Sequence, residues 1–136
     1  MTWRLVHTDA LQLVQLYVLA AAVVRGVDYL ITPPGSSEVL NLIERAAPLW
    51  LWAVVFIAFG VLGLAGEWWM SFGISTNRWI ASYIAHAGLV ALYLAVGIGA
   101  LSDVLDRDPP YGFRTPMEWI FIAAVHAIFV RRRERV

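Results

Sequence analysis

The chain has 136 residues, of which 60% are hydrophobic and 15% charged; its formal net charge is zero and it contains no cysteine. The mean hydropathy of +0.69 excludes an ordinary soluble domain, and the balanced charge gives no reason to expect a nucleic-acid partner. Without cysteine there are no disulfides, thiolate metal sites or catalytic thiols. The composition predicts an all-α membrane protein.

The first predicted transmembrane helix covers residues 10–31, ahead of the helix-breaking sequence Thr32-Pro33-Pro34-Gly35. Arg25 and Asp28 stand one helical turn apart near its end. Opposite charges three residues apart lie on one helix face, so we expect an intramembrane ion pair with a structural role.

A short helix over residues 37–45 comes next, in which apolar and polar residues alternate at helical spacing. Such a two-faced helix beside a span is predicted to lie in the membrane interface. The second span, residues 46–66, carries no charge or carboxamide. As a helix it would be about 32 Å long, enough to cross a hydrocarbon core of about 30 Å.

The third predicted span, residues 79–101, has His86 as its single ionisable residue, and an acidic loop predicted to be solvated follows it. Thr115 and Glu118 have the spacing of a capping box around Pro116, which predicts a helix start at this point. The fourth span, residues 116–130, is short. The arginines of the basic tail, residues 131–136, are therefore expected to extend toward the membrane surface.

Four spans place both termini on one side of the membrane. The tail, Arg4 and Arg78 put most of the arginines on that side, which the positive-inside rule assigns to the cytoplasm. The seven tryptophans fall near the ends of the predicted spans, as in interfacial aromatic belts. We therefore expect a multi-pass protein of the cytoplasmic (inner) membrane with cytoplasmic N- and C-termini.

Small residues recur at helical spacing in the second and third spans, where they would let helix backbones approach closely. They are Gly60, Gly63, Gly66, Ala81, Ala85 and Gly88. The sequence predicts that they form helix-packing faces inside the bundle. It leaves open that one face serves assembly of a homo-oligomer or binding to a larger membrane complex.

His86 and His126 are predicted to lie in the inner leaflet, together with Gln12 and Gln15 of the first span and Ser82 and Tyr83 of the third. A histidine within a span is a functional candidate, and neutral imidazoles can bind haem iron, so the pair is a candidate cofactor site. A hydrogen-bonded polar cluster with a structural or gating role is the interpretation we prefer. We expect no cofactor and no metal. No nucleotide loop, serine–histidine–acid pattern or zinc-protease motif is present, so we do not expect an enzyme.

The size of the chain, its four closely spaced spans, the small-residue faces and the basic tail at Arg131–Arg135 resemble small phage holins and related lysis-cassette membrane proteins. The resemblance implies a protein that oligomerises in the cytoplasmic membrane and permeabilises it. One alternative is an accessory subunit or assembly factor of a larger membrane complex. A second is a haem- or quinone-handling redox protein that uses His86 and His126.

Overall fold

The computed structural model describes residues 8–36, 41–71 and 79–133, and these segments contain helices and turns but no strand. Five helices follow one another: α1 (Thr8–Ile31), α2 (Asn41–Ala46), α3 (Leu49–Ser71), α4 (Trp79–Leu105) and α5 (Arg114–Arg133). The predicted all-α fold is confirmed for this part of the chain.

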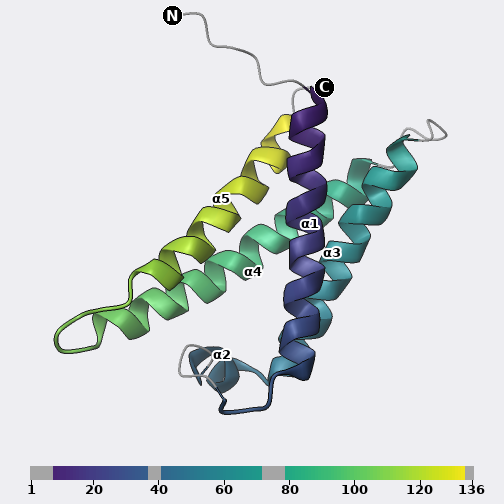
Figure 1. Ribbon diagram of the computed structural model, residues 1–136. Coiled ribbons are helices and arrows are strands. Elements are labelled where there is room, and N and C mark those ends of the chain that lie inside the picture. The colour runs from purple at the N-terminus through teal and green to yellow at the C-terminus, as the bar shows by residue number, and fades with distance from the viewer. Residues whose placement is uncertain (1–7, 37–40, 72–78, 134–136) are drawn as a thin grey trace, which may run out of the picture.

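The four long helices form two antiparallel pairs. α1 packs along α3, α4 packs along α5, and the two pairs are joined chiefly by the contact between α3 and α4. Figure 1 shows the pairs crossing, with the beginning of α1 and the end of α5 at the same end of the bundle. α1 and α5 touch over a much smaller area, so few side chains connect these two helices.

The outside of the bundle is apolar and its centre holds polar groups. Large apolar side chains are exposed on all four long helices, among them Tyr17, Trp50, Ile98 and Phe121. A water-soluble bundle shows the opposite distribution, with its apolar stripe buried and its polar side chains in solvent. The arrangement suits a surface that faces lipid.

Three helices are long and apolar enough to cross a membrane, over Asp9–Ile31, Leu49–Met70 and Trp79–Leu105. The prediction of four spans is thus supported for three helices only. α5 falls short because it begins with Arg114 and ends in three arginines at 131–133. The apolar stretch between Glu118 and these arginines would be only about 18 Å long. Residues 134–136 of the predicted tail lie outside the described residues.

The helix boundaries differ from the predicted ones where proline or continued helical hydrogen bonding decides them. α3 begins at Leu49, three residues after the predicted start, because Pro48 disfavours helical geometry at Ala47. It then continues through Glu67 to Ser71, and α4 extends four residues beyond the predicted end at residue 101. These extensions carry Glu67 into the helical bundle.

The short helix α2 covers only part of the predicted segment 37–45, of which residues 37–40 lie outside the described residues. Its Ile43 side chain is buried, and the Ile43 carbonyl accepts a hydrogen bond from Trp52 Nε1 at 3.1 Å. The Glu44 carboxylate accepts a hydrogen bond from the Gly35 amide at 2.9 Å. These contacts fix α2 against the beginning of α3.

The predicted capping box at the start of α5 is wrong. The Met117 amide donates to the Phe113 carbonyl at 3.2 Å, so Phe113 is the residue that precedes the helix. Thr115 and Pro116 therefore lie within the first turn, where proline is tolerated because its missing N–H would have no helical partner. Glu118 instead accepts a hydrogen bond from Arg114 Nε at 2.8 Å.

Candidate functional site

Five buried polar side chains from all four long helices meet in the interior of the bundle. They are Gln15 from α1, Glu67 from α3, Ser82 and His86 from α4, and His126 from α5. We call this group the polar cluster. Each of the five is at most 6% exposed. Burying polar groups at this depth is costly unless they bond to one another, and their hydrogen bonds show that they do.

The Glu67 carboxylate forms the first part of the cluster. Its Oε1 atom accepts hydrogen bonds from Gln15 Nε2 at 2.7 Å and from the Ser82 hydroxyl at 2.5 Å. Gln15 Nε2 also lies 3.3 Å from Ser82 Oγ. A carboxylate oxygen that receives two donors is well satisfied, and the pair of bonds ties α3 to both α1 and α4.

The two histidines continue the cluster as a directional chain. Gln15 Nε2 lies 3.1 Å from His86 Nε2, and the Nδ1 atoms of His86 and His126 are 2.7 Å apart. Because the amide nitrogen of Gln15 can only donate, His86 Nε2 must accept. A neutral His86 then carries its proton on Nδ1 and donates to His126 Nδ1. His126 consequently carries its own proton on Nε2.

The far end of this chain is an unsatisfied donor. His126 is fully buried, and its Nε2 atom has no hydrogen-bond partner in the part of the chain that the structure describes. Aromatic rings enclose the two histidines: the Tyr93 ring stacks on His126 at 5.4 Å and the Phe129 ring on His86 at 5.2 Å. Leaving such a donor unpaired costs about 1–3 kcal/mol of stability. An unpaired donor at this position therefore calls for a functional explanation.

The structure brings the two candidate cofactor ligands together but bonds them to each other. Two imidazole nitrogens on one tetrahedral zinc ion, each about 2.0–2.1 Å from it, would be about 3.4 Å apart. The observed separation of 2.7 Å is that of a hydrogen bond. Among the described residues no group of three histidine or acidic side chains is placed to hold a metal ion. The geometry therefore fits a proton-sharing pair.

The predicted small-residue faces pack within the chain. A Cβ atom at Gly60 would lie 2.6 Å from Val23 Cγ2 of α1, and one at Gly66 would lie 2.8 Å from the Ser82 amide of α4. At Gly63 a Cβ would meet both Leu19 and Ala85.

The predicted faces on α4 pack against α3. Ala85 is fully buried, and Ala81 lies against Gly66. A Cβ atom at Gly88 would lie 2.5 Å from the Phe59 ring. The small residues thus allow α3 to approach α1 and α4 closely, and the bundle itself occupies these faces.

Arg25 and Asp28 are not brought together as an ion pair. The ion pairs found among the described residues join Arg107 to Asp103 and Arg114 to Glu118. The Arg25 guanidinium instead lies over the Trp119 ring of α5, 3.8 Å from its centroid. Asp28 is exposed on the surface of α1.

Sequence reasoning did not include Glu67 in the cluster, although its spacing contains the signal. Glu67 follows Gly60 by seven residues and Gly63 by four, so it continues the face on which those glycines pack. The contact between Arg25 and Trp119 has no comparable signal, because it depends on how the two helix pairs cross.

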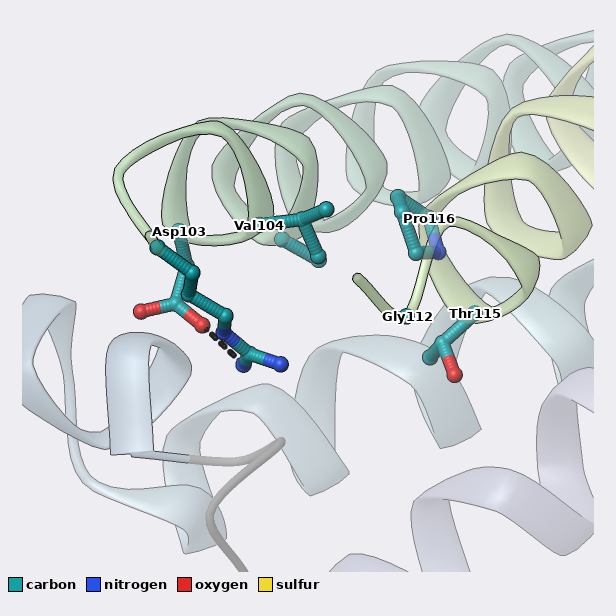
Figure 2. Close-up of a pocket in the computed structure, with 7 residues that line it drawn as sticks. Asp103, Val104, Gly112, Thr115 and Pro116 are labelled. Atoms are coloured by element: carbon teal, nitrogen blue, oxygen red, sulfur yellow. Dashed lines mark hydrogen bonds and ion pairs between the residues drawn. The ribbon is translucent and has the colours of Figure 1, made fainter. Parts of the chain in front are cut away.

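A small hollow of about 90 Å³ lies at the opposite end of the α4–α5 pair (Figure 2). Its charged lining residues, Asp103 and Arg107, form an ion pair at 2.6 Å, which Figure 2 marks with a dashed line. Gly112 and Thr115 close the other side of the hollow. Since its charges neutralise each other, the hollow offers no free charged group to a ligand.

Comparison of the chain with protein-family models, curated proteins and solved structures finds no match. The fold and the site define a class nonetheless: an all-helical bundle of membrane-spanning composition with a hydrogen-bonded acidic and histidine cluster at its centre. Its function has to be argued from that cluster.

Proposed function

We propose that this protein spans the cytoplasmic membrane four times and permeabilises it to protons through the polar cluster. The observation that carries the proposal is the buried cluster in which Gln15 donates to both Glu67 and His86, and His86 and His126 share a direct Nδ1–Nδ1 contact. Acidic and histidine side chains inside membrane helices commonly form proton relays. This is a narrower form of the permeabilisation that the holin resemblance implies.

The fourth crossing is α5, and its packing supports it. α5 lies along α4, and its His126 is part of the bundle interior. The end of α5 then lies at the inner surface, where local thinning of the membrane can accommodate its short apolar stretch. Both termini are cytoplasmic in this proposal, which agrees with the distribution of arginines in the sequence.

Proton uptake begins at the inner end of the bundle. Glu67 stands four residues from the end of α3, and Ser82 three residues from the beginning of α4, so both lie within about one turn of this end of the bundle. A proton that reaches His86 can pass to His126 along the short Nδ1–Nδ1 contact, while the proton on His126 Nε2 leaves on the other side. The unpaired His126 donor is thus the exit of the chain.

The outward half of the path needs water between the two helix pairs. Along α5 the next buried aromatic side chain in this direction, Trp119, stands two turns from His126, about 10 Å away by helical rise. If both histidines are charged, both Nδ1 atoms become donors and their mutual hydrogen bond is lost. We propose that this loss loosens the α4–α5 contact and admits water, so proton entry itself opens the path.

The proposal competes with a wide oligomeric lesion of the holin type. Such a lesion needs outward-facing contact surfaces, whereas the glycine face of α3 is filled by α1 and α4. A route for protons needs only one copy of the bundle.

Proton flux into liposomes tests the proposal. With a potassium gradient and valinomycin as driving force, an enclosed pH dye should report a several-fold faster proton flux with protein than without it. His126→Phe keeps a ring of similar volume but removes the exit donor, and should return the flux to the protein-free level. Gln12→Ala is the matched control, because Gln12 is exposed on α1.

Each result decides the proposal. A flux that does not exceed that of empty liposomes, or that His126→Phe leaves unchanged, overturns it. Release of enclosed carboxyfluorescein would show a wide lesion and would support the holin reading in place of a proton path.

A further inference from the structure

Arg25 places a positive charge inside α1, six residues before the helix ends at Ile31. At the rise of an α-helix this is about 9 Å from the end of the span. Its guanidinium lies over the Trp119 ring, 3.8 Å from the centroid, and 6.0 Å from the centroid of Tyr93. The aromatic faces stabilise the charge but accept few of its N–H donors.

No carboxylate forms an ion pair with these donors in the described part of the chain. The ion pairs found there join Arg107 to Asp103 and Arg114 to Glu118, and Asp28 is exposed on the surface of α1. A guanidinium has five N–H donors in a planar fork, and within a membrane it requires acceptors with negative charge. An arginine at this depth that bonds only to aromatic faces lacks its counter-ion.

The Tyr29 hydroxyl is a second unsatisfied group at the same place. Tyr29 is 3% exposed, and its oxygen has no hydrogen-bond partner among the described residues. It lies close to the Arg25 guanidinium, one turn further along α1. A buried hydroxyl and a half-buried guanidinium therefore lie side by side at one end of the bundle, and neither has an anionic partner among the described residues.

We propose that Arg25 and Tyr29 form a binding site for the phosphate of a phospholipid in the leaflet at this end of the bundle. A phosphodiester offers the two anionic oxygens that match the guanidinium fork, and it can accept from the tyrosine hydroxyl as well. Its acyl chains would run along the exposed apolar side chains of α1 beside the site, Val24, Val27 and Leu30.

A phospholipid fits this site better than a soluble anion because the surroundings are apolar. Arg25 is only partly exposed, and the exposed residues on either side of it on α1 are valines. The site lies at the opposite end of α1 from Gln15, some 15 Å away by helical rise. The inference is thus independent of the proposed proton path, and it holds for either orientation of the protein in the membrane.

Binding of lipid to delipidated protein tests the site. The full chain is purified in a maltoside detergent, which contains no phosphate, and is titrated with dioctanoyl phosphatidylglycerol, with dioctanoylglycerol and with inorganic phosphate. Native mass spectrometry and calorimetry count the bound molecules. We expect one molecule of phosphatidylglycerol to bind saturably, and neither of the other two probes to bind at the same concentration.

Three variants define which groups bind it. Arg25→Gln keeps length and amide donors but removes the charge, and should weaken binding about tenfold or more. Tyr29→Phe removes one hydrogen bond and should weaken it several-fold. Asp28→Asn is the matched control on the same helix and should bind like the wild type.

The outcomes separate cleanly. Equal binding by the wild type and Arg25→Gln, or equal binding of dioctanoylglycerol, overturns the site. Tight binding of inorganic phosphate overturns the lipid as its occupant. If circular dichroism shows that Arg25→Gln has lost helix, Tyr29→Phe and Arg25→Lys decide the matter: unchanged lipid binding in both overturns the proposal.

Discussion

Gln15 contributes to the hydrogen bonds between the two helix pairs, beside the bond from Ser82 to Glu67. Its single amide nitrogen lies within hydrogen-bond distance of Glu67 Oε1, Ser82 Oγ and His86 Nε2. Position 15 is consequently sensitive to substitution, whereas position 12, one turn away on the same helix, is not. Gln12 lies on the exposed surface of the same helix.

We predict that Gln15→Leu destabilises the protein by about 3 kcal/mol, because it removes the Gln15 donor from both the buried Glu67 carboxylate and the buried His86 imidazole. Gln12→Leu should change stability by less than about 0.5 kcal/mol. Denaturation in detergent, followed by circular dichroism, measures both. Equal stability of the two variants would contradict the hydrogen-bond chain.

The sequence predicted much of the polar cluster, because intramembrane histidines are rare enough to be informative. From depth alone it grouped His86 and His126 with Gln15 and Ser82, but also with Gln12 and Tyr83, which the structure leaves outside the cluster. Glu67 was left at the span boundary, since a carboxylate at a helix end is equally compatible with water. Arg25 was matched to its nearest opposite charge in the sequence, because the crossing of the helix pairs that brings Trp119 to it is a property of the fold.

At the scale of the helices, the glycines of α3 decide how closely the helices approach. The sequence identified these positions correctly as small-residue faces but could not say which helix would cover them. In the structure α1 and α4 cover these positions, because Leu19 and Ala85 both contact the Gly63 position. Substitution here should therefore affect folding of a single chain before it affects any assembly.

We predict that Gly63→Leu lowers the stability of the monomer by about 2 kcal/mol or more, because the added side chain has no space between α1 and α4. Ala58→Leu, on the exposed side of the same helix, should be nearly neutral. Unfolding in detergent compares them. A Gly63→Leu variant that folds as stably as Ala58→Leu but loses self-association would show that the face is external.

For the whole molecule, the open point is how α5 is placed relative to the bilayer. Its apolar stretch is short, yet it contributes His126 to the centre of the bundle. Packing against α4 offsets the limited hydrophobicity of α5, so composition alone underestimates its fit to the membrane. This is why counting apolar residues supports three crossings and the position of His126 supports four.

Labelling of single introduced cysteines tests this topology, since the natural sequence contains no cysteine. We predict that an impermeant thiol reagent added outside intact cells labels Ser36→Cys and Asp106→Cys, but neither Ser75→Cys nor Val136→Cys. Val136 is the informative position. Labelling of Val136→Cys from outside, with Ser75→Cys protected, would mean that α5 does not cross.

The polar cluster also has a consequence for how the chain is made. Its members are spread from residue 15 to residue 126, so the ribosome makes the other four before His126 is available. Until α5 packs against α4, His86 has no His126 to share its proton, and the polar groups of the cluster are incompletely hydrogen-bonded. A chain truncated before α5 would keep its three most apolar helices, but those polar groups would still lack hydrogen-bond partners.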